Sequence, residues 1–215
     1  MFDFQLIIDS FPLLLVGAGV TLKITAISVG LVLLFSLFIG IAQIFRVAIF
    51  RIPAKIYVDF LRGTPLLVQI FMIYFALPML IGTRIDPFIA AIVACSINSS
   101  AYIAEIFRGG ILSIDKGQME AGRSLGLNWS QTMRFVVIPQ AFKRIIPPLG
   151  NEFIAMLKDS SLVSVIGFEE LTRQGQLIIA STYGAMEIWT AVALIYLALT
   201  FPITRLVAYL EKRYK

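Results

Sequence analysis

The stretch Ile24–Ile44, ITAISVGLVLLFSLFIGIAQI, is 21 residues long and contains no charged side chain. A helix needs about 20 mostly apolar residues to cross the roughly 30 Å hydrocarbon core of a bilayer. The sequence therefore predicts an all-α, polytopic membrane protein. Four further segments are long and apolar enough to make five transmembrane helices in all: Tyr57–Ile81, Pro87–Phe107, Leu149–Gly167 and Ile188–Leu210.

The overall composition agrees with a membrane protein. Of the 215 residues, 59% are apolar and 14% are charged, and the mean hydropathy is +0.89, whereas soluble domains are about 45–50% apolar and about 25% charged. Histidine is absent and Cys95 is the single cysteine. This excludes histidine-based acid/base catalysis, the familiar zinc and iron–sulfur ligand sets and an intramolecular disulfide, so we expect no metal and no cofactor.

The N-terminal stretch Phe2–Val20 is apolar but is interrupted by Asp9, Pro12 and Gly17. We expect an interfacial segment that leads into the first transmembrane helix, because the stretch is short and broken. A cleaved signal peptide fits poorly, since the first charged residues are acidic and a basic start is missing.

Positive charge is concentrated on one side of a five-helix arrangement. Because Lys and Arg prefer the cytoplasmic side, this places the N-terminus outside and the C-terminus in the cytoplasm. The net charge of +5 then reflects topology, and nucleic acid is not an expected partner. The opposite side has only Arg84 and Arg173 in its loops, whereas 14 of the 18 cations lie on the cytoplasmic side: Arg46, Arg51, Lys55, Arg62, Arg108, Lys116, Arg123, Arg134, Lys143, Arg144, Arg205, Lys212, Arg213 and Lys215.

The longest polar stretch, residues 109–146, carries two helix signals. Asp115 with Gln118 resembles a capping box, and Gly126 suits a left-handed C-terminal cap. A second capping box, formed by Asn128 and Gln131, opens a helix that we expect to end near Pro139. Loops longer than about 12–15 residues usually have internal structure or a function, so we predict a compact pair of short helices on the cytoplasmic face. A merely solvated connection is the alternative.

The same loop resembles the EAA loop of ABC importer permeases, E-A-A-x3-G-x9-I-x-L-P. The matching residues are Glu120-Ala121-Gly122, Gly126 and Val136–Pro139, with conservative departures at Gly122, Val136 and Ile138. Other stretches are similar to the polar amino acid branch, the histidine, glutamine and arginine permeases: Arg62–Gln69 (RGTPLLVQ), Ala101–Gly110 (AYIAEIFRGG), Asn151–Ile154 (NEFI) and Lys158–Leu162 (KDSSL).

The resemblance implies that residues 1–215 form one type I ABC importer transmembrane domain, with residues 109–146 as its cytoplasmic coupling loop. It implies a permease subunit, not an enzyme, in the cytoplasmic (inner) membrane of a prokaryote. The implied partners are a separate ABC ATPase dimer, a second permease chain of the same or a homologous kind, and an extracytoplasmic substrate-binding protein that meets loops 82–86 and 169–184. The chain itself contains no G-x-x-x-x-G-K-[ST] phosphate loop.

In proteins of this family the short cytoplasmic helix docks in a groove of the ATPase. Carried over to this chain, the resemblance assigns ATPase coupling to Glu120, Ala121, Gly122, Leu125, Gly126 and Leu127. The alternative for Glu120 is a surface carboxylate paired locally with Arg123.

Charged residues inside a membrane segment are costly and usually face a partner or a cavity. Glu152 and Asp159 are seven residues apart, which places both on one helix face. If Pro147 and Pro148 occupy the first turn, Asp159 lies about 15 Å inside, near the depth at which transporters bind substrate. Thr64-Pro65 interrupts the second helix and frees a backbone carbonyl. The predicted substrate site comprises Thr64, Asn98, Ser99, Glu152, Asp159, Ser160 and Ser161.

These groups suit a zwitterion, with carboxylates for an α-ammonium group and amide and hydroxyl groups for an α-carboxylate. The excess of acid favours a cationic amino acid, with glutamine or glutamate as the alternative. Asp159 has a structural alternative, pairing with Lys158 or with another chain, and Glu105 with Arg108 is expected to be a local ion pair.

Two other functions are compatible with Glu152 and Asp159. The pair could couple proton or ion flux in a secondary amino acid transporter, which would not need a docking loop. It could also act as acid and base in a membrane enzyme, but no nucleophile–base couple of the ordinary type accompanies it. An importer driven by a separate ATPase is therefore the favoured prediction.

Overall fold

The computed structural model describes residues 2–44 and 47–214, and within these ranges every regular element is helical. Arg46 and Lys215, two of the predicted cytoplasmic cations, lie outside the described residues. The all-α prediction is confirmed. The elements in chain order are α1 (Phe4–Ile44), α2 (Ala48–Gly63), α3 (Leu66–Phe71), the π-helix η1 (Met72–Ala76), α4 (Leu77–Ile81), α5 (Pro87–Leu112), α6 (Lys116–Ser124), α7 (Trp129–Thr132), the π-helix η2 (Met133–Val137), α8 (Ile138–Asp159), the 3-10 helix η3 (Ser160–Ile166), α9 (Leu171–Thr182) and α10 (Ala185–Tyr214).

All five predicted transmembrane segments are helical, but they differ in shape. Among the described residues, α1, α5 and α10 are long and apolar enough to cross a membrane alone. The predicted second segment is bent by 105° between α2 and α3, and the bent pair counts as a fourth candidate if it is one span. The predicted fourth segment lies within α8 and η3, which is too polar to meet the same criterion.

The prediction of a separate N-terminal interfacial segment is wrong, because α1 is one continuous helix from Phe4. Pro12 and Gly17 do not end it, since this half of α1 packs tightly on α9 and α10. A Cβ on Gly17 would lie 2.8 Å from the Cα of Leu171, so glycine allows the close approach. Leu14 is buried there with Leu171 and Ile188, and this burial offsets the helix-breaking residues.

The prediction that a helix ends near Pro139 is also wrong. Pro139 is the second residue of α8, just after the π-helix η2, where the hydrogen-bond spacing differs from that of an α-helix, and Pro147 and Pro148 lie inside α8. Ile145 and Leu149 on either side of the proline pair are buried against α1 and α5, and this packing favours the helix despite the lost bonds. Asp159 is thus the last of 22 residues in α8, and the depth inferred from prolines in the first turn does not hold.

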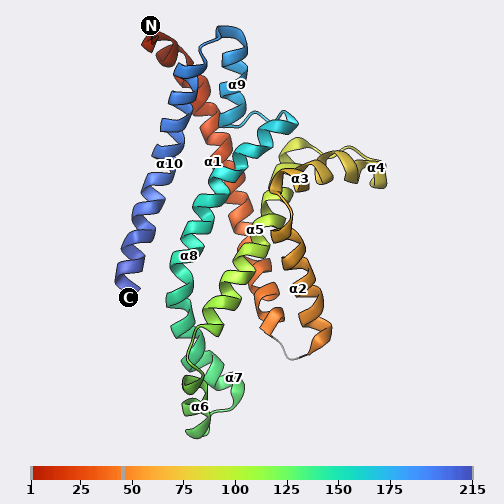
Figure 1. Cartoon of the computed structure of the whole chain (residues 1–215), viewed down its shortest axis with the longest axis vertical. Coiled ribbons are helices and arrows are strands. Elements are labelled where there is room, and N and C mark those ends of the chain that lie inside the picture. Colours follow the sequence, from red (N-terminus) through yellow and green to blue (C-terminus); the bar gives the residue numbers. More distant parts are fainter. Residues whose placement is uncertain (1, 45–46, 215) are drawn as a thin grey trace.

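Helix α5 lies at the centre of the bundle, between α1, α2, α3 and α8 (Figure 1). Its small buried residues Ala90, Ala91, Ala94 and Cys95 pack on α1, α3 and η3. Gly40 of α1 approaches α5 so closely that a Cβ would lie 2.7 Å from the carbonyl oxygen of Ala104. Small side chains therefore bring α1 and α5 into close contact.

The two ends of the bundle differ in charge. The N-terminal end of α1 and α9 lie at one end, whereas α6, α7, the start of α2 and the C-terminal part of α10 extend toward the other (Figure 1). Most of the described cations that were predicted to be cytoplasmic belong to the start of α2, to α6 and η2, and to the end of α10. The others are Arg62 at the C-terminal end of α2, Arg108 in α5, and Lys143 and Arg144 in α8, whereas Arg173 is on α9. The one-sided charge distribution seen in the sequence is therefore present in three dimensions.

Candidate functional site

The bend between α2 and α3 is built around Thr64. Pro65 disfavours helical backbone at the residue before it, and Thr64 is extended, with φ −120° and ψ 142°. The Gln69 side-chain amide donates to the carbonyl oxygens of Leu61 (2.9 Å) and Thr64 (3.2 Å) and to the Thr64 hydroxyl (2.9 Å). The carbonyls of Leu61 and Thr64 are therefore already paired, and the prediction that the break offers a free carbonyl fails at these two positions.

Asn98 belongs to the same network. Its side-chain amide donates to Oε1 of Gln69 over 3.1 Å, and both side chains are buried. Asn98 thus joins the centre of α5 to the bend, where it fixes the orientation of Gln69. In the sequence Gln69 is the last residue of the Arg62–Gln69 motif, and the long-range contacts that give it this role leave no local signal there.

A second polar cluster contains Ser99, Glu152 and Asp159. Ser99 and Asp159 both lie close enough to Glu152 to act on its carboxylate. Glu152 is half-buried and Asp159 is exposed. The predicted constellation is therefore two neighbouring groups, a bend network with Thr64 and Asn98 and a carboxylate cluster between α5 and α8.

The two serines that follow Asp159 differ. Ser160 is fully buried and its hydroxyl donates to the Leu157 carbonyl at 2.7 Å, whereas Ser161 is half-buried in η3. Asp159 forms no ion pair within 4.0 Å among residues 2–44 and 47–214, although Lys158 is close enough to act on its charge. Asp159 therefore presents an accessible carboxylate at the junction of α8 and η3.

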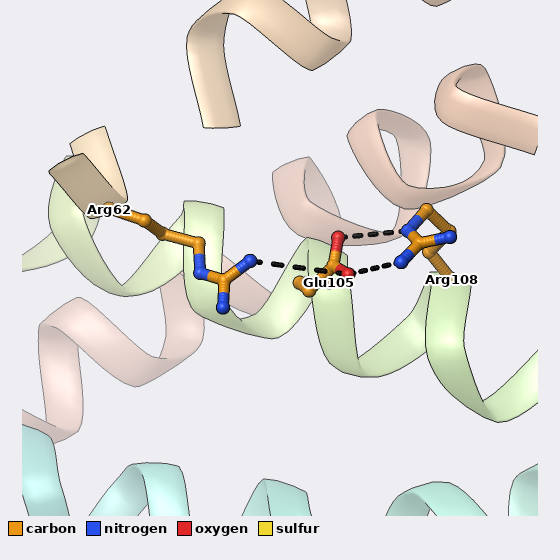
Figure 2. Close-up of polar contacts among 3 residues, drawn as sticks. All are labelled: Arg62, Glu105 and Arg108. Carbon is orange, nitrogen blue, oxygen red and sulfur yellow. Dashed lines mark hydrogen bonds and ion pairs between the residues drawn. The ribbon is translucent and has the colours of Figure 1, made fainter. Parts of the chain in front are cut away.

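Arg62 is a neighbour of this cluster that the sequence did not indicate as a site residue. Its guanidinium lies 4.0 Å from Oε1 of Glu105, stacks on the ring of Tyr102 with its carbon 5.5 Å from the centroid, and acts on the charge of Glu152. Figure 2 shows Arg62 reaching Glu105 from the side opposite Arg108. The predicted local pair of Glu105 and Arg108 is confirmed, with Nε 2.9 Å from Oε2 and a second contact at Oε1.

At the opposite end from α6, Glu170 is fully buried. Its carboxylate accepts hydrogen bonds from the backbone N–H groups of Thr172 (2.9 Å) and Arg173 (2.8 Å), which caps α9. It also accepts from the hydroxyls of Tyr196 (3.0 Å) and Thr21 (3.4 Å), and so joins α1, α9 and α10. Burial raises the pKa of Glu170 above its ordinary value, against the opposing effect of these donors.

The polar loop contains the first predicted helix, α6, whereas the second predicted helix begins at Trp129 and continues through η2 into α8. Asn128 and Gln131 form the complete capping box, with bonds of 2.9 and 2.8 Å. Asp115 caps α6 by accepting from Gly117, but the Gln118 side chain accepts from Gln140 of α8, so the expected reciprocal half of that capping box is absent. Gly126 is left-handed, with φ +86°, as a C-terminal cap requires.

The predicted coupling residues lie on α6 and the turn after it. Glu120 and Ala121 are exposed, Leu125 is 83% exposed and Leu127 is half-buried. Within the described ranges Glu120 has no ion pair with Arg123, so the alternative of local pairing finds no support. Gly122 is buried against Thr132 of α7, and an alanine there would place its Cβ 3.0 Å from the threonine hydroxyl.

This arrangement of helices can be compared with known proteins. The family described as the binding-protein-dependent transport system inner membrane component matches residues 32–215. The chain belongs to this family. Its members are transport components and not enzymes, and the predicted permease family and subunit type are confirmed.

Individual family members are similar along their whole length. The chain is 48% identical to the glutamine transport system permease protein GlnP of Escherichia coli K12 over 215 residues, which is 100% of this chain and 98% of GlnP. It is 39% identical to the arginine transport system permease protein ArtQ of Bacillus subtilis over 213 residues, covering 99% and 97% of the two chains. A crystal structure of an amino acid ABC transporter with histidines matches 99% of each chain with a TM-score of 0.94 and 44% identity. The type I ABC importer fold is therefore confirmed, and a member of this family is an inner membrane component.

Proposed function

We propose that this chain is the membrane-spanning permease subunit of an ABC importer that carries a polar L-amino acid by alternating access. The observation that carries the proposal is its 48% identity to a glutamine permease over the full length of both chains. The matched length includes the exposed coupling loop, the bend at Thr64 and the carboxylate cluster. We further propose that residues 1–215 act as one transmembrane domain, with residues 109–146 as its coupling loop.

For the substrate we propose a site between α5 and α8 in which Glu152 and Asp159 bind the α-ammonium group. Ser99 orients Glu152, and Ser161 supplies a hydroxyl beside Asp159. Thr64, Asn98 and Ser160 each already have a hydrogen-bond partner within the protein. We therefore propose that they hold the surrounding helices in place and do not bind the substrate directly.

The net charge of the residues around the site indicates which class of amino acid side chain the site binds. The sequence indicated an excess of acid and so a cationic substrate. Arg62 and Lys158 act on Glu152 and Asp159 respectively, so two cations offset the two carboxylates. We therefore propose a polar amino acid with a neutral side chain, as in glutamine, ahead of a cationic one.

For energy coupling we propose that an ABC ATPase dimer docks on α6 and the turn that follows it. Leu125, almost fully exposed at the end of α6, provides an apolar anchor. Glu120, exposed and without an ion pair in the described part of the chain, is available to a basic group of the ATPase. Ala121, Gly122, Gly126 and Leu127 shape the same surface.

The orientation follows from the positive charge around the coupling loop and from the rule that such charge faces the cytoplasm. We propose that the N-terminus is outside and the C-terminus inside, in the cytoplasmic membrane of a prokaryote. A substrate-binding protein then meets loops 82–86 and 169–184, and a second permease chain, identical or homologous, completes the pathway.

Transport by the reconstituted complex tests this proposal. The chain, its ATPase and its binding protein are placed in proteoliposomes, and uptake of radiolabelled glutamine and arginine is measured with and without ATP. We expect ATP-dependent uptake of glutamine that Glu152→Gln reduces, while the control Glu211→Gln at the end of α10 leaves it unchanged. Uptake driven by a proton or ion gradient without ATP would instead establish the secondary transporter. If the Glu152→Gln variant takes up each amino acid as well as the wild type does, the assigned site is refuted.

A further inference from the structure

A polar cavity of about 710 Å³ is lined by residues of α1, α2 and α5. The start of α2 lies toward the end of the bundle that carries the coupling loop (Figure 1). Its volume is within the range of about 300–1,000 Å³ that is typical of ligand sites. Gln43 lines it from α1, and α2 contributes Arg51, Lys55, Asp59 and Arg62. The spacing of these four α2 residues, 4, 4 and 3, places them in one stripe along the helix.

The cavity has an excess of positive charge. Arg62 and Arg108 share the single carboxylate of Glu105 (Figure 2), and all three residues line the cavity. Arg51 and Lys55 form no ion pair with any described residue, and both are exposed. The four cations that line the cavity face two carboxylates, Asp59 and Glu105, so the cavity has a net charge of +2.

Gln43 adds a second, independent observation. Its side-chain Nε2 is buried and has no hydrogen-bond acceptor among the described residues. A buried N–H donor without a partner is rare in proteins. Because this donor lines a cation-rich cavity, a bound anion would supply an acceptor to the donor and would neutralise the cations as well.

The edge of the cavity is apolar and open. Ile52 and Ile56 line it and are 53% and 63% exposed, and Phe60, one turn further along α2, is 55% exposed. A free phosphate ion gains nothing from these side chains, whereas the acyl chains of a lipid would cover them. Basic pockets between transmembrane helices on the cytoplasmic side are known to bind phospholipid headgroups.

We propose that this cavity binds the phosphate group of an anionic phospholipid, with Arg51 and Lys55 at the phosphate and the acyl chains along Ile52 and Ile56. Gln43 donates to a headgroup oxygen from the inner wall. The proposal places the lipid in the cytoplasmic leaflet and so rests on the proposed orientation, but not on the transported substrate or on the ATPase. Because the cavity has a net charge of +2, it favours a headgroup with a net negative charge over a zwitterionic one.

Lipid binding to the full-length chain tests this site directly. The chain is purified in a non-ionic detergent, and the dissociation constant of phosphatidylglycerol with a fluorescent acyl chain is measured by anisotropy at fixed ionic strength. The double variant Arg51→Gln/Lys55→Gln is compared with Lys212→Gln/Arg213→Gln, which removes the same charge from the exposed end of α10. Since one cation near an anionic membrane surface contributes about 1 kcal/mol, the first variant should bind about thirtyfold more weakly and the second should match the wild type.

Three further arms separate the possible sources of the effect. Gln43→Leu should weaken binding as well, because the inner donor is lost. Labelled phosphatidylcholine should bind much more weakly than phosphatidylglycerol, and sodium phosphate should not compete at concentrations that leave the micelles intact. Equal loss in the two double variants, equal binding of the two lipids, or competition by phosphate alone would each overturn the lipid site. Because neither ATPase nor substrate is present, failure here is distinct from failure of the proposed transport function.

Discussion

Replacing Gly122 by alanine tests whether the departure from the E-A-A pattern has a packing cause. Gly122 is buried where α6 meets α7, and an added Cβ would lie 3.0 Å from the Thr132 hydroxyl oxygen and closer still to the Thr132 methyl group. Thr132 is fully buried, and its hydroxyl donates to the Asn128 carbonyl at 3.0 Å. The threonine therefore cannot turn away without losing that bond.

Two opposing effects set the magnitude. Alanine in place of glycine stabilises a helix by up to about 1 kcal/mol, whereas an extra methyl group forced into a packed site costs about 1–3 kcal/mol. We expect the packing cost to exceed the helical gain, so Gly122→Ala should destabilise the α6–α7 pair by about 1–2 kcal/mol. Thr132→Ser removes the methyl group and keeps the hydroxyl, so the double variant should recover most of the loss.

Hydrogen exchange measured by mass spectrometry reports this local stability. A loss of about 1–2 kcal/mol corresponds to exchange that is roughly five- to thirtyfold faster for the protected α6 amides. Gly109→Ala is the matched control, because a Cβ there meets nothing within 4 Å, and it should leave α6 unchanged. Slower or unchanged exchange in Gly122→Ala, or no recovery in the double variant, would refute the packing explanation.

Three further predictions follow from single residues. Gln69→Leu leaves the Leu61 and Thr64 carbonyls and Asn98 without their partner, so the thermal midpoint in detergent should fall by the equivalent of about 3 kcal/mol or more; an unchanged midpoint would contradict the bend network. Glu170 has a raised pKa, so its contribution to stability is full below the ordinary glutamate pKa of about 4.3 and declines as pH rises through the raised value; Glu170→Gln should flatten this decline in midpoints measured against pH, and an unaltered slope would assign it to another group. Glu120→Lys should abolish substrate-stimulated ATP hydrolysis in proteoliposomes without changing the helical content by circular dichroism, whereas normal stimulation would exclude the docking role.

The features that could be predicted from sequence are those that local chemistry determines. The capping box of Asn128 and Gln131 and the left-handed Gly126 depend on residues within a few positions of each other, and both are present. Glu105 and Arg108, which form the predicted ion pair, are likewise only three residues apart on one helix.

The features that could not be predicted depend on contacts between distant segments. Pro12 and Gly17 predict a break in α1, but packing on α9 keeps the helix continuous. The Gln118 side chain does not complete the expected capping box with Asp115, because it accepts a hydrogen bond from Gln140 of α8 instead. In the candidate site, helical spacing alone places Glu152 and Asp159 on one face of α8, whereas the position of Arg62 beside Glu105 depends on the packing of α2 on α5.

The course of α8 relates the coupling loop to the carboxylate cluster. Because the helix does not end at Pro139, α7, η2 and α8 follow one another without a loop, from the cap at Asn128 to Asp159. Glu152 lies 14 residues after the start of α8, about 21 Å at 1.5 Å per residue, so a movement of the loop reaches it through a single helix. Within that helix, η2 and the proline pair Pro147-Pro148 are the positions where the regular hydrogen-bond pattern changes or is lost. We therefore expect bending to concentrate at these two places, so that α6 and α7 can follow a docked ATPase while Leu149 and Met156 stay packed against α1 and α5.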